Sequence, residues 1–369
     1  MQTNNRLLYI DNLRSLMIIL VVFLHSAVTY SGIGSWYYVE NMSAGKGATL
    51  FFVFFESFTQ AYFMSLLFLL AGYFVPGAIS KKGNKQFVKD RLFRLGIPVC
   101  IYIIFIHPVC VKLAYPGINF FDFYITGFQS LELFSWTGPL WFALTLLIFS
   151  LGYAFIRPFV TLKSNIKITS MSVIFLILVI TILAFAIRLI YPIGSSVMNL
   201  QFCFFAAYIV LFIVGAEMYK QNILSLISIK IFKYYLFVSL VIGIPLWFAI
   251  SIFSGVSTDI SIISGGFHWE PLAYAFWESF FCVTFIIALI GLFKNIFHTQ
   301  NKIQKFISDN SFGVYFFHAP VLIAVTILCK SLELPSVLKF LISGSIAVSF
   351  TFILVFLIRK IPFMKYIFS

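Results

Sequence analysis

Ten separate apolar stretches divide this chain, and they constrain its fold more than any other feature of the sequence. A helix needs roughly 20 mainly apolar residues to cross the hydrocarbon core of a bilayer, and each stretch has about that length. The stretches run over Leu13–Tyr30, Leu50–Ala78, Leu95–Leu113, Pro139–Ile156, Ile168–Ile190, Leu200–Met218, Tyr235–Phe253, Pro271–Phe293, Ser311–Leu328 and Ser336–Ile358. The sequence therefore predicts an all-α, polytopic membrane protein with about ten transmembrane helices.

The composition excludes an ordinary water-soluble fold. Hydrophobic residues make up 61% of the chain and charged residues only 10%, whereas soluble domains are about half apolar and about a quarter charged. A soluble protein has no interior large enough for 48 phenylalanines, but a bilayer accommodates them. No internal repeat, low-complexity tract or linker interrupts the pattern. We therefore expect residues 1–369 to form a single transmembrane domain.

The lysines and arginines are distributed unevenly between the two sides of this ten-helix arrangement. Of the 25 Lys and Arg residues, all but five fall at the N-terminus, in the even-numbered loops or in the C-terminal tail. The five exceptions are Lys46, Lys112, Arg188, Lys330 and Lys339. Cytoplasmic loops carry an excess of Lys and Arg, so we expect both termini to lie in the cytoplasm. The net charge of +13 then reflects topology, and we expect no nucleic-acid partner.

The cysteines do not indicate a metal centre or a disulfide framework. All five lie within or at the edges of the apolar stretches, namely Cys100, Cys110, Cys203, Cys282 and Cys329. None belongs to a CxxC pair or has the spacing of metal ligands. We therefore expect neither a disulfide nor a bound metal ion.

Two ionisable side chains lie in the first apolar stretch, where such groups are costly and by default indicate function. Arg14 and His25 are eleven residues apart, which places them on one helical face and about 16 Å apart along the axis. Asp11 precedes Arg14 by three residues and is placed to pair with it. His25 could act as a base within the membrane, or it could only hydrogen-bond to a neighbouring helix. This stretch alone leaves both interpretations open.

A basic segment from Lys81 to Arg94 separates the second and third stretches and holds six cations against one acid, Asp90. Within it, Arg91 and Arg94 fall on one helical face at the mouth of the third stretch. Two guanidinium groups there could clamp a phosphate from the cytoplasm. The alternative is ordinary anchoring of the cytoplasmic side, with contacts to anionic lipids. Anchoring accounts for the lysines, but it does not require the spacing of the two arginines.

Three further polar residues lie inside apolar stretches. Tyr315 and His318 share a face of the ninth stretch and could orient a substrate or relay a proton. Glu278 lies in the eighth stretch, too deep to be a solvated acid. We expect it to pair with His25, His107 or an arginine, or to bind hydroxyl groups of a substrate. Hydrogen bonding between helices is the structural alternative for all three residues.

Five short motifs, each weak alone, occur together along the chain. They are Arg14 followed by ten residues and His25, FLLAGYF at 68–74, RLFRLGIP at 91–98, GPLWF at 138–142 and YFFHAP at 315–320. In this combination and order the chain resembles the acyltransferase-3 family of integral membrane acyltransferases. The start YIDNLR at 9–14 and the segment 32–38, which contains Trp36, are most similar to the branch of glucan-modifying succinyltransferases.

The resemblance implies transfer of an acyl group, of acetyl or succinyl type, from cytoplasmic acyl-CoA to a hydroxyl of an extracytoplasmic glycan or glycoconjugate. It implies that His25 is the catalytic histidine, that Arg14 is its partner, and that Arg91 and Arg94 bind the acyl donor. The remaining candidates for substrate binding or support are Asp11, Trp141, Glu278, Tyr315 and His318. The expected location is a bacterial inner membrane, with acyl-CoA as the donor and no metal.

The competing hypothesis is a proton-coupled transporter or flippase of an envelope glycan or lipid. In it, His25, Glu278 and His318 would form a proton relay. The lack of an internal repeat and of paired broken helices argues against this class. The sequence leaves open the acyl group, the acceptor, the oligomeric state, and whether transfer is direct or passes through an acyl-histidine.

Overall fold

A computed structural model of the chain describes residues 7–40, 45–159, 168–256 and 259–368. Within these ranges there is no β-strand, and ten helices are long and apolar enough to cross a membrane. Each predicted stretch overlaps one of these helices, so the all-α class and the ten membrane-spanning helices are confirmed. Three cations counted for the cytoplasmic side, Arg6, Lys163 and Lys167, lie outside the described residues.

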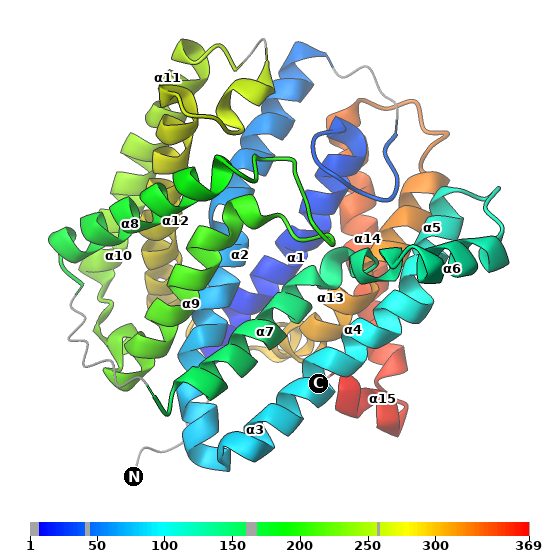
Figure 1. The fold of residues 1–369 in the computed structure, drawn as a ribbon, viewed down its shortest axis with the longest axis horizontal. Coiled ribbons are helices and arrows are strands. Elements are labelled where there is room, and N and C mark those ends of the chain that lie inside the picture. Colours follow the sequence, from blue (N-terminus) through cyan, green and yellow to red (C-terminus); the bar gives the residue numbers. More distant parts are fainter. Residues whose placement is uncertain (1–6, 41–44, 160–167, 257–258, 369) are drawn as a thin grey trace. The chain divides into compact units, whose positions relative to one another are not determined.

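Six of the ten spans are single α-helices (Figure 1). Two others contain π-helical turns, and two begin with a short 3₁₀-helix. The spans are α1 (Leu8–Ser31), α2 (Lys46–Lys82), α3 to α5 (Asn84–Ala114), η4 with α7 (Gly138–Ile156), α8 (Ser170–Arg188), η5 with α9 (Phe202–Lys220), α10 to α11 (Ile229–Phe253), α12 (Trp269–Ile296), α13 (Lys302–Leu328) and α14 (Ser336–Ile358). Two short helices, α6 (Phe120–Gln129) and α15 (Pro362–Ile367), lie outside these spans.

Wider, π-helical turns end two residues before each of three prolines. The segment η1 (Leu92–Gly96) precedes Pro98, and η2 (Tyr102–Ile106) precedes Pro108. In the same way, η7 (Ser239–Gly243) precedes Pro245. Proline has no N–H to donate to the preceding turn, and its ring crowds the carbonyl there, so a wider turn relieves the helix. The chain therefore keeps a helical course through all three prolines.

Two spans begin at capping boxes that the sequence encodes locally. At the start of α8, the Thr169 hydroxyl accepts a hydrogen bond from the backbone N–H of Ser172, and the Ser172 hydroxyl accepts one from Thr169. At the start of α13, Asn301 and Gln304 exchange the same pair of bonds. These side chains satisfy backbone N–H groups that the first turn leaves unpaired. As a result, α13 begins nine residues before the apolar stretch predicted from Ser311.

The described residues form two compact units, and each is built from three separate stretches of the chain. The first unit holds Met1–Leu13, Gln60–Lys89 and Ile148–Thr299. The second holds Arg14–Thr59, Asp90–Leu147 and Gln300–Ser369. Because the units interleave along the chain, α1 and α2 each contribute residues to both. The single domain predicted for residues 1–369 stays a prediction.

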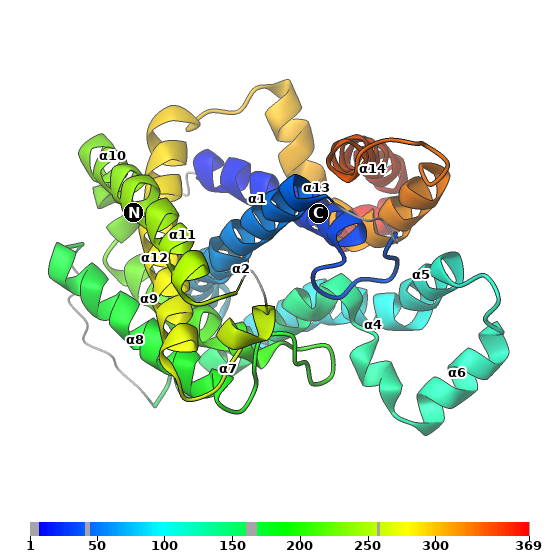
Figure 2. The ribbon, with the colours of Figure 1, turned by 90° about the horizontal axis from the view of Figure 1, so that it is seen from above.

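In the first unit, α12 packs against both α8 and α10, and it runs beside them in Figures 1 and 2. The buried Trp277 on α12 donates from Nε1 to the carbonyl of Gly243 at 2.9 Å. Helices α2 and α9 approach so closely that a Cβ on Gly72 would lie 2.1 Å from the carbonyl oxygen of Phe212. Only glycine permits this separation, so these two membrane helices pack backbone against backbone.

In the second unit, α13 packs along α14, and the two helices lie side by side in Figures 1 and 2. A Cβ on Gly313 of α13 would lie 2.4 Å from Val355 of α14. Helix α1 joins them, because Ser26 donates from its hydroxyl to the carbonyl of Phe340 at 3.1 Å. This unit contains most of the candidate site residues, namely Arg14, His25, Arg91, Arg94, Trp141, Tyr315 and His318.

Candidate functional site

Two predicted site residues, His25 and His318, meet in the second unit. His25 lies on α1, six residues before the helix ends at Ser31, and His318 lies fully buried on α13. Nε2 of His318 is 3.2 Å from Nδ1 of His25, and the two ring centroids are 5.2 Å apart. Both residues were candidates, but their contact was not predicted. The structure therefore places a pair of imidazoles inside a bundle of apolar helices.

An aromatic side chain that was not among the candidates covers the His25 ring. Trp36 follows α1 in the segment 32–40, and its indole stacks on His25 with centroids 4.0 Å apart and planes 23° apart. The end of this segment is anchored by Glu40, whose carboxylate pairs with the buried ammonium of Lys339 at 2.6 Å. The resemblance drew attention to the segment, but nothing in its local sequence connects Trp36 with His25.

A second polar cluster in the same unit surrounds Tyr37, which follows Trp36. The Tyr37 hydroxyl lies 2.8 Å from Nδ1 of His107 and 3.3 Å from the hydroxyl of Tyr102. Burial raises the pKa of Tyr37 well above its ordinary value, so its hydroxyl stays protonated and can donate to His107. Trp136 also stacks on His107, with ring centroids 5.3 Å apart. This cluster was not predicted from the sequence.

Two of the motifs on which the resemblance rests touch each other here. The hydroxyl of Tyr315 donates to the carbonyl of Pro139, next to the half-buried Trp141 that begins α7. Gly138 has a positive φ of 47°, and a Cβ there would lie 2.4 Å from the Tyr37 hydroxyl. Only glycine combines that conformation with that approach. The motif at 138–142 thus supports both polar clusters.

The three predicted arginines also belong to the second unit. Arg14 is exposed on α1, Arg91 ends α3 and Arg94 is exposed in the π-helical turn that follows. The charges of Arg14 and Arg94 both act on Arg91, so the three guanidinium groups lie within electrostatic range. Asp11, the predicted partner of Arg14, belongs to the first unit, and its ion pair with Arg14 stays a prediction. The carboxylate of Asp90 also acts on Arg91, so the cluster holds three guanidinium groups and one acid.

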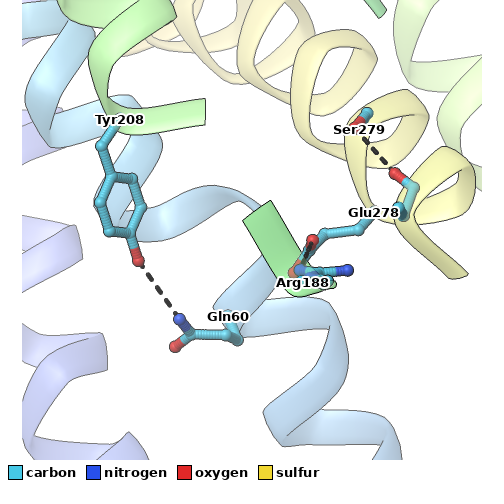
Figure 3. Close-up of polar contacts among 6 residues, drawn as sticks. Gln60, Arg188, Tyr208, Glu278 and Ser279 are labelled. Atoms are coloured by element: carbon cyan, nitrogen blue, oxygen red, sulfur yellow. Dashed lines mark hydrogen bonds and ion pairs between the residues drawn. The ribbon is translucent and has the colours of Figure 1, made fainter. Parts of the chain in front are cut away.

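In the first unit, Glu278 pairs with an arginine, one of the partners expected for it. Figure 3 shows the carboxylate of Glu278 on α12 and the guanidinium of Arg188 on α8 pointing toward one another. Nη2 of Arg188 donates to Oε2 of Glu278. The rings of Phe204 and Tyr274 lie 5.6 Å and 5.8 Å from the guanidinium carbon. A buried cation with one carboxylate and two aromatic neighbours is thereby partly shielded from the apolar surroundings.

Arg188 and Lys339 fall near the ends of predicted stretches and were counted with the cations of the side opposite to the termini, and the structure shows that both are buried. Arg188 is the last residue of α8 and 1% exposed, and Lys339 lies in the first turn of α14 and is 3% exposed. Each is buried because it pairs with an acid far away in the sequence, Glu278 or Glu40. Local hydropathy cannot distinguish a buried cation at the end of a span from one in the adjoining loop.

A small cavity lies beside Glu278, with room for roughly one water molecule. It is lined by α2, α8, α9 and α12, and its polar residues include Gln60 and Tyr208. Nε2 of Gln60 donates to the Tyr208 hydroxyl at 3.3 Å (Figure 3). The polar residues of this cavity give Glu278 a polar neighbourhood in addition to Arg188. Its role as a substrate-binding or supporting residue stays a prediction.

The described residues contain no group of three or more His, Cys, Asp or Glu side chains that could hold a metal ion. The second unit brings together side chains of several chemical kinds. They comprise two paired imidazoles, two hydrogen-bonded tyrosines, stacked indoles and a group of arginines.

Comparison with known families gives one match. A family model described as an acyltransferase domain, the acyltransferase-3 model, matches residues 7–359 and so covers both units. Among curated proteins and among solved structures, no match to the chain was found.

Proposed function

The chain belongs to the acyltransferase-3 family of membrane acyltransferases, and we propose that it moves an acyl group from cytoplasmic acyl-CoA to a hydroxyl of an extracytoplasmic glycan or glycoconjugate. Family membership supports an acyltransferase that crosses the membrane several times. The donor, the acceptor and the acetyl or succinyl type of acyl group are the specific content of the proposal.

The observation that carries the proposal is an imidazole held in place inside the bundle. His25 is hydrogen-bonded to His318 on one side and covered by Trp36. As a general base, His25 takes the proton of the acceptor hydroxyl while that oxygen attacks the thioester carbon. The carbon–sulfur bond then breaks, and the leaving CoA thiolate takes the proton from His25. The same ring would serve as nucleophile if transfer passes through an acyl-histidine.

The positive charges of the three arginines match the negative charges of the proposed donor, acyl-CoA. CoA carries phosphates at one end of a long arm and the thioester at the other, and phosphates cannot enter hydrocarbon. Arg14, Arg91 and Arg94 would hold the phosphates, because guanidinium groups bind them with paired hydrogen bonds. Arg14 and His25 are about 16 Å apart along α1, a separation that the arm of CoA must bridge.

The proposed orientation follows from charge. With both termini in the cytoplasm of a bacterial inner membrane, the arginines face acyl-CoA and His25 lies toward the acceptor side. Trp141 and Tyr315 would then support the site from α7 and α13. We assign Asp11 and Glu278 to supporting positions outside the reacting groups.

The test is acyl transfer by the full chain purified in detergent, with radiolabelled acetyl-CoA or succinyl-CoA and an envelope glycan fraction as the acceptor. Replacing His25 with Ala should lower kcat/KM by roughly 10²–10⁴ in a protein that still folds, as its thermal midpoint shows. His298, an exposed histidine outside the site, provides the matched control His298→Ala. Full transfer by the His25→Ala protein would refute the assignment. Activity that appears only across sealed vesicles and stops with an uncoupler would favour proton-coupled transport instead.

A further inference from the structure

The hydrogen bonds of His318 determine which of its nitrogens carries the proton. Nδ1 of His318 lies 2.7 Å from the backbone carbonyl oxygen of Tyr315, one turn earlier on α13. A carbonyl oxygen can only accept a hydrogen bond, so Nδ1 must be the protonated nitrogen. A neutral imidazole carries one proton, and Nε2 of His318 is then left with a free lone pair.

That lone pair determines the proton position on His25 in turn. Nε2 of His318 faces Nδ1 of His25 at 3.2 Å. Two lone pairs cannot form a hydrogen bond, so His25 must donate from Nδ1. The second nitrogen of His25, Nε2, is left unprotonated at the end of the ring away from the backbone.

The surroundings favour neutral rings on both histidines. His318 is fully buried, and no carboxylate among the described residues contacts either imidazole. The partners are the backbone carbonyl of Tyr315 for His318, and for His25 the backbone of Val21 and the stacked indole of Trp36. Placing an uncompensated cation in such apolar packing is costly, so a doubly protonated His318 is disfavoured. The chain of bonds therefore has one direction, from His25 through His318 to the Tyr315 carbonyl.

From this geometry we infer that His318 is a positioning residue, which fixes His25 in the tautomer with its proton on Nδ1 and presents Nε2 as the atom that accepts the acceptor's proton. This rests on the proposed function only for what Nε2 then does. His318 touches no reacting atom. It acts by orienting the His25 ring and by choosing its tautomer, as an orienting group does for a catalytic histidine in general.

The direct test reads the tautomer and does not depend on the acceptor. The full chain, labelled with ¹⁵N at histidine and held in lipid nanodiscs, reports protonated and unprotonated ring nitrogens by NMR. A His25→Gln protein assigns the His25 signals. In the wild-type protein we expect protonated Nδ1 and unprotonated Nε2 on His25. In His318→Leu, His25 loses its side-chain acceptor and keeps only the hydrogen bond to the backbone of Val21, one turn earlier on α1, so we expect the share of His25 with its proton on Nε2 to rise clearly above that of the wild type.

Two further variants separate positioning from packing. His318→Gln offers an amide oxygen as acceptor and should restore the Nδ1-protonated tautomer of His25. Tyr315→Phe removes a hydroxyl but keeps the backbone carbonyl, so it should leave the His25 tautomer as in the wild type. Thermal midpoints identify any variant that fails to fold. If His318→Leu folds and His25 keeps its proton on Nδ1, the inference is wrong.

Activity measurements separate this inference from the proposed function. We expect His318→Leu to lower kcat by roughly 10²–10⁴ and His318→Gln to recover most of the loss. If His25→Ala abolishes acyl transfer but the tautomer of His25 is the same in the wild type and in His318→Leu, the inference is wrong and the proposed function stands. If the tautomer of His25 changes in His318→Leu but the wild-type protein transfers no acyl group, the proposed function is wrong and the inference stands.

Discussion

Removing the carboxylate of Glu278 should strongly destabilise the first unit. The change Glu278→Gln leaves the guanidinium of Arg188 without a counter-ion at a position where it is 1% exposed. Among the described residues, Nε and Nη1 of Arg188 already lack a hydrogen-bond partner, so the carboxylate is its main compensation. Breaking one side of a buried ion pair costs about 3–5 kcal/mol, because the remaining charge stays buried.

The double replacement Arg188→Met with Glu278→Leu provides the decisive comparison. Replacing both partners of a buried pair with apolar residues of similar volume is often neutral or stabilising. We therefore expect the double variant to recover most of the loss of about 3–5 kcal/mol caused by the single change. The exposed pair of Lys305 and Asp309 serves as the reference, and Lys305→Gln should cost under about 1 kcal/mol.

The assay is the thermal unfolding midpoint of the protein in detergent. It is monitored by the loss of the helical circular dichroism signal, under conditions in which the protein does not aggregate. At about 2 °C per kcal/mol, the single change should lower the midpoint by about 6–10 °C. The double variant should lie within about 2 °C of the wild type. If Glu278→Gln leaves the midpoint unchanged, or the double variant is as unstable as the single one, the pair is not the buried, mutually dependent contact described above.

Three further changes test other contacts. Gly138→Ala places a Cβ 2.4 Å from a tyrosine hydroxyl and should cost about 1–3 kcal/mol, whereas Gly152→Ala, with no heavy atom within 4 Å, should stay within about 1 kcal/mol. Equal midpoints for the two would contradict the packing argument. Lys339→Met leaves the Glu40 carboxylate buried and should cost about 3–5 kcal/mol in the same assay, and adding Glu40→Gln should recover most of it. A neutral single change there would show that the pair does not anchor the segment 32–40. Arg91→Lys should raise the KM for acyl-CoA about tenfold at constant kcat, and a fall in kcat alone would contradict a role in donor binding.

The membrane-spanning helices were predictable because their signal is local. The length of an apolar run can be read from the sequence, and it shows whether a helix could cross the membrane. All ten runs correspond to helices of the structure. The extra length of some helices was missed where polar residues extend them. In α13, for example, the cap at Asn301 starts the helix well before the apolar residues begin. Periodicity also placed Arg14 and His25 on one face of α1 without knowledge of any partner.

The contacts of the site were not predictable in this way. His25 and His318 are separated by 293 positions, and Arg188 and Glu278 by 90. Arg188 lies near the end of the predicted stretch Ile168–Ile190, and no neighbouring residue indicates the acid that lets it be buried. Trp36 was noticed only as part of a motif.

By itself, the sequence determined how many helices cross the membrane, roughly where each one begins and ends, and which family the motifs resemble. Only the tertiary structure decided which polar groups meet and which nitrogen of each histidine carries a proton. The physical reason is that a hydrophobic run specifies a helix but neither its rotation nor its depth relative to other helices. Hydrogen bonds such as that between His25 and His318 depend on both.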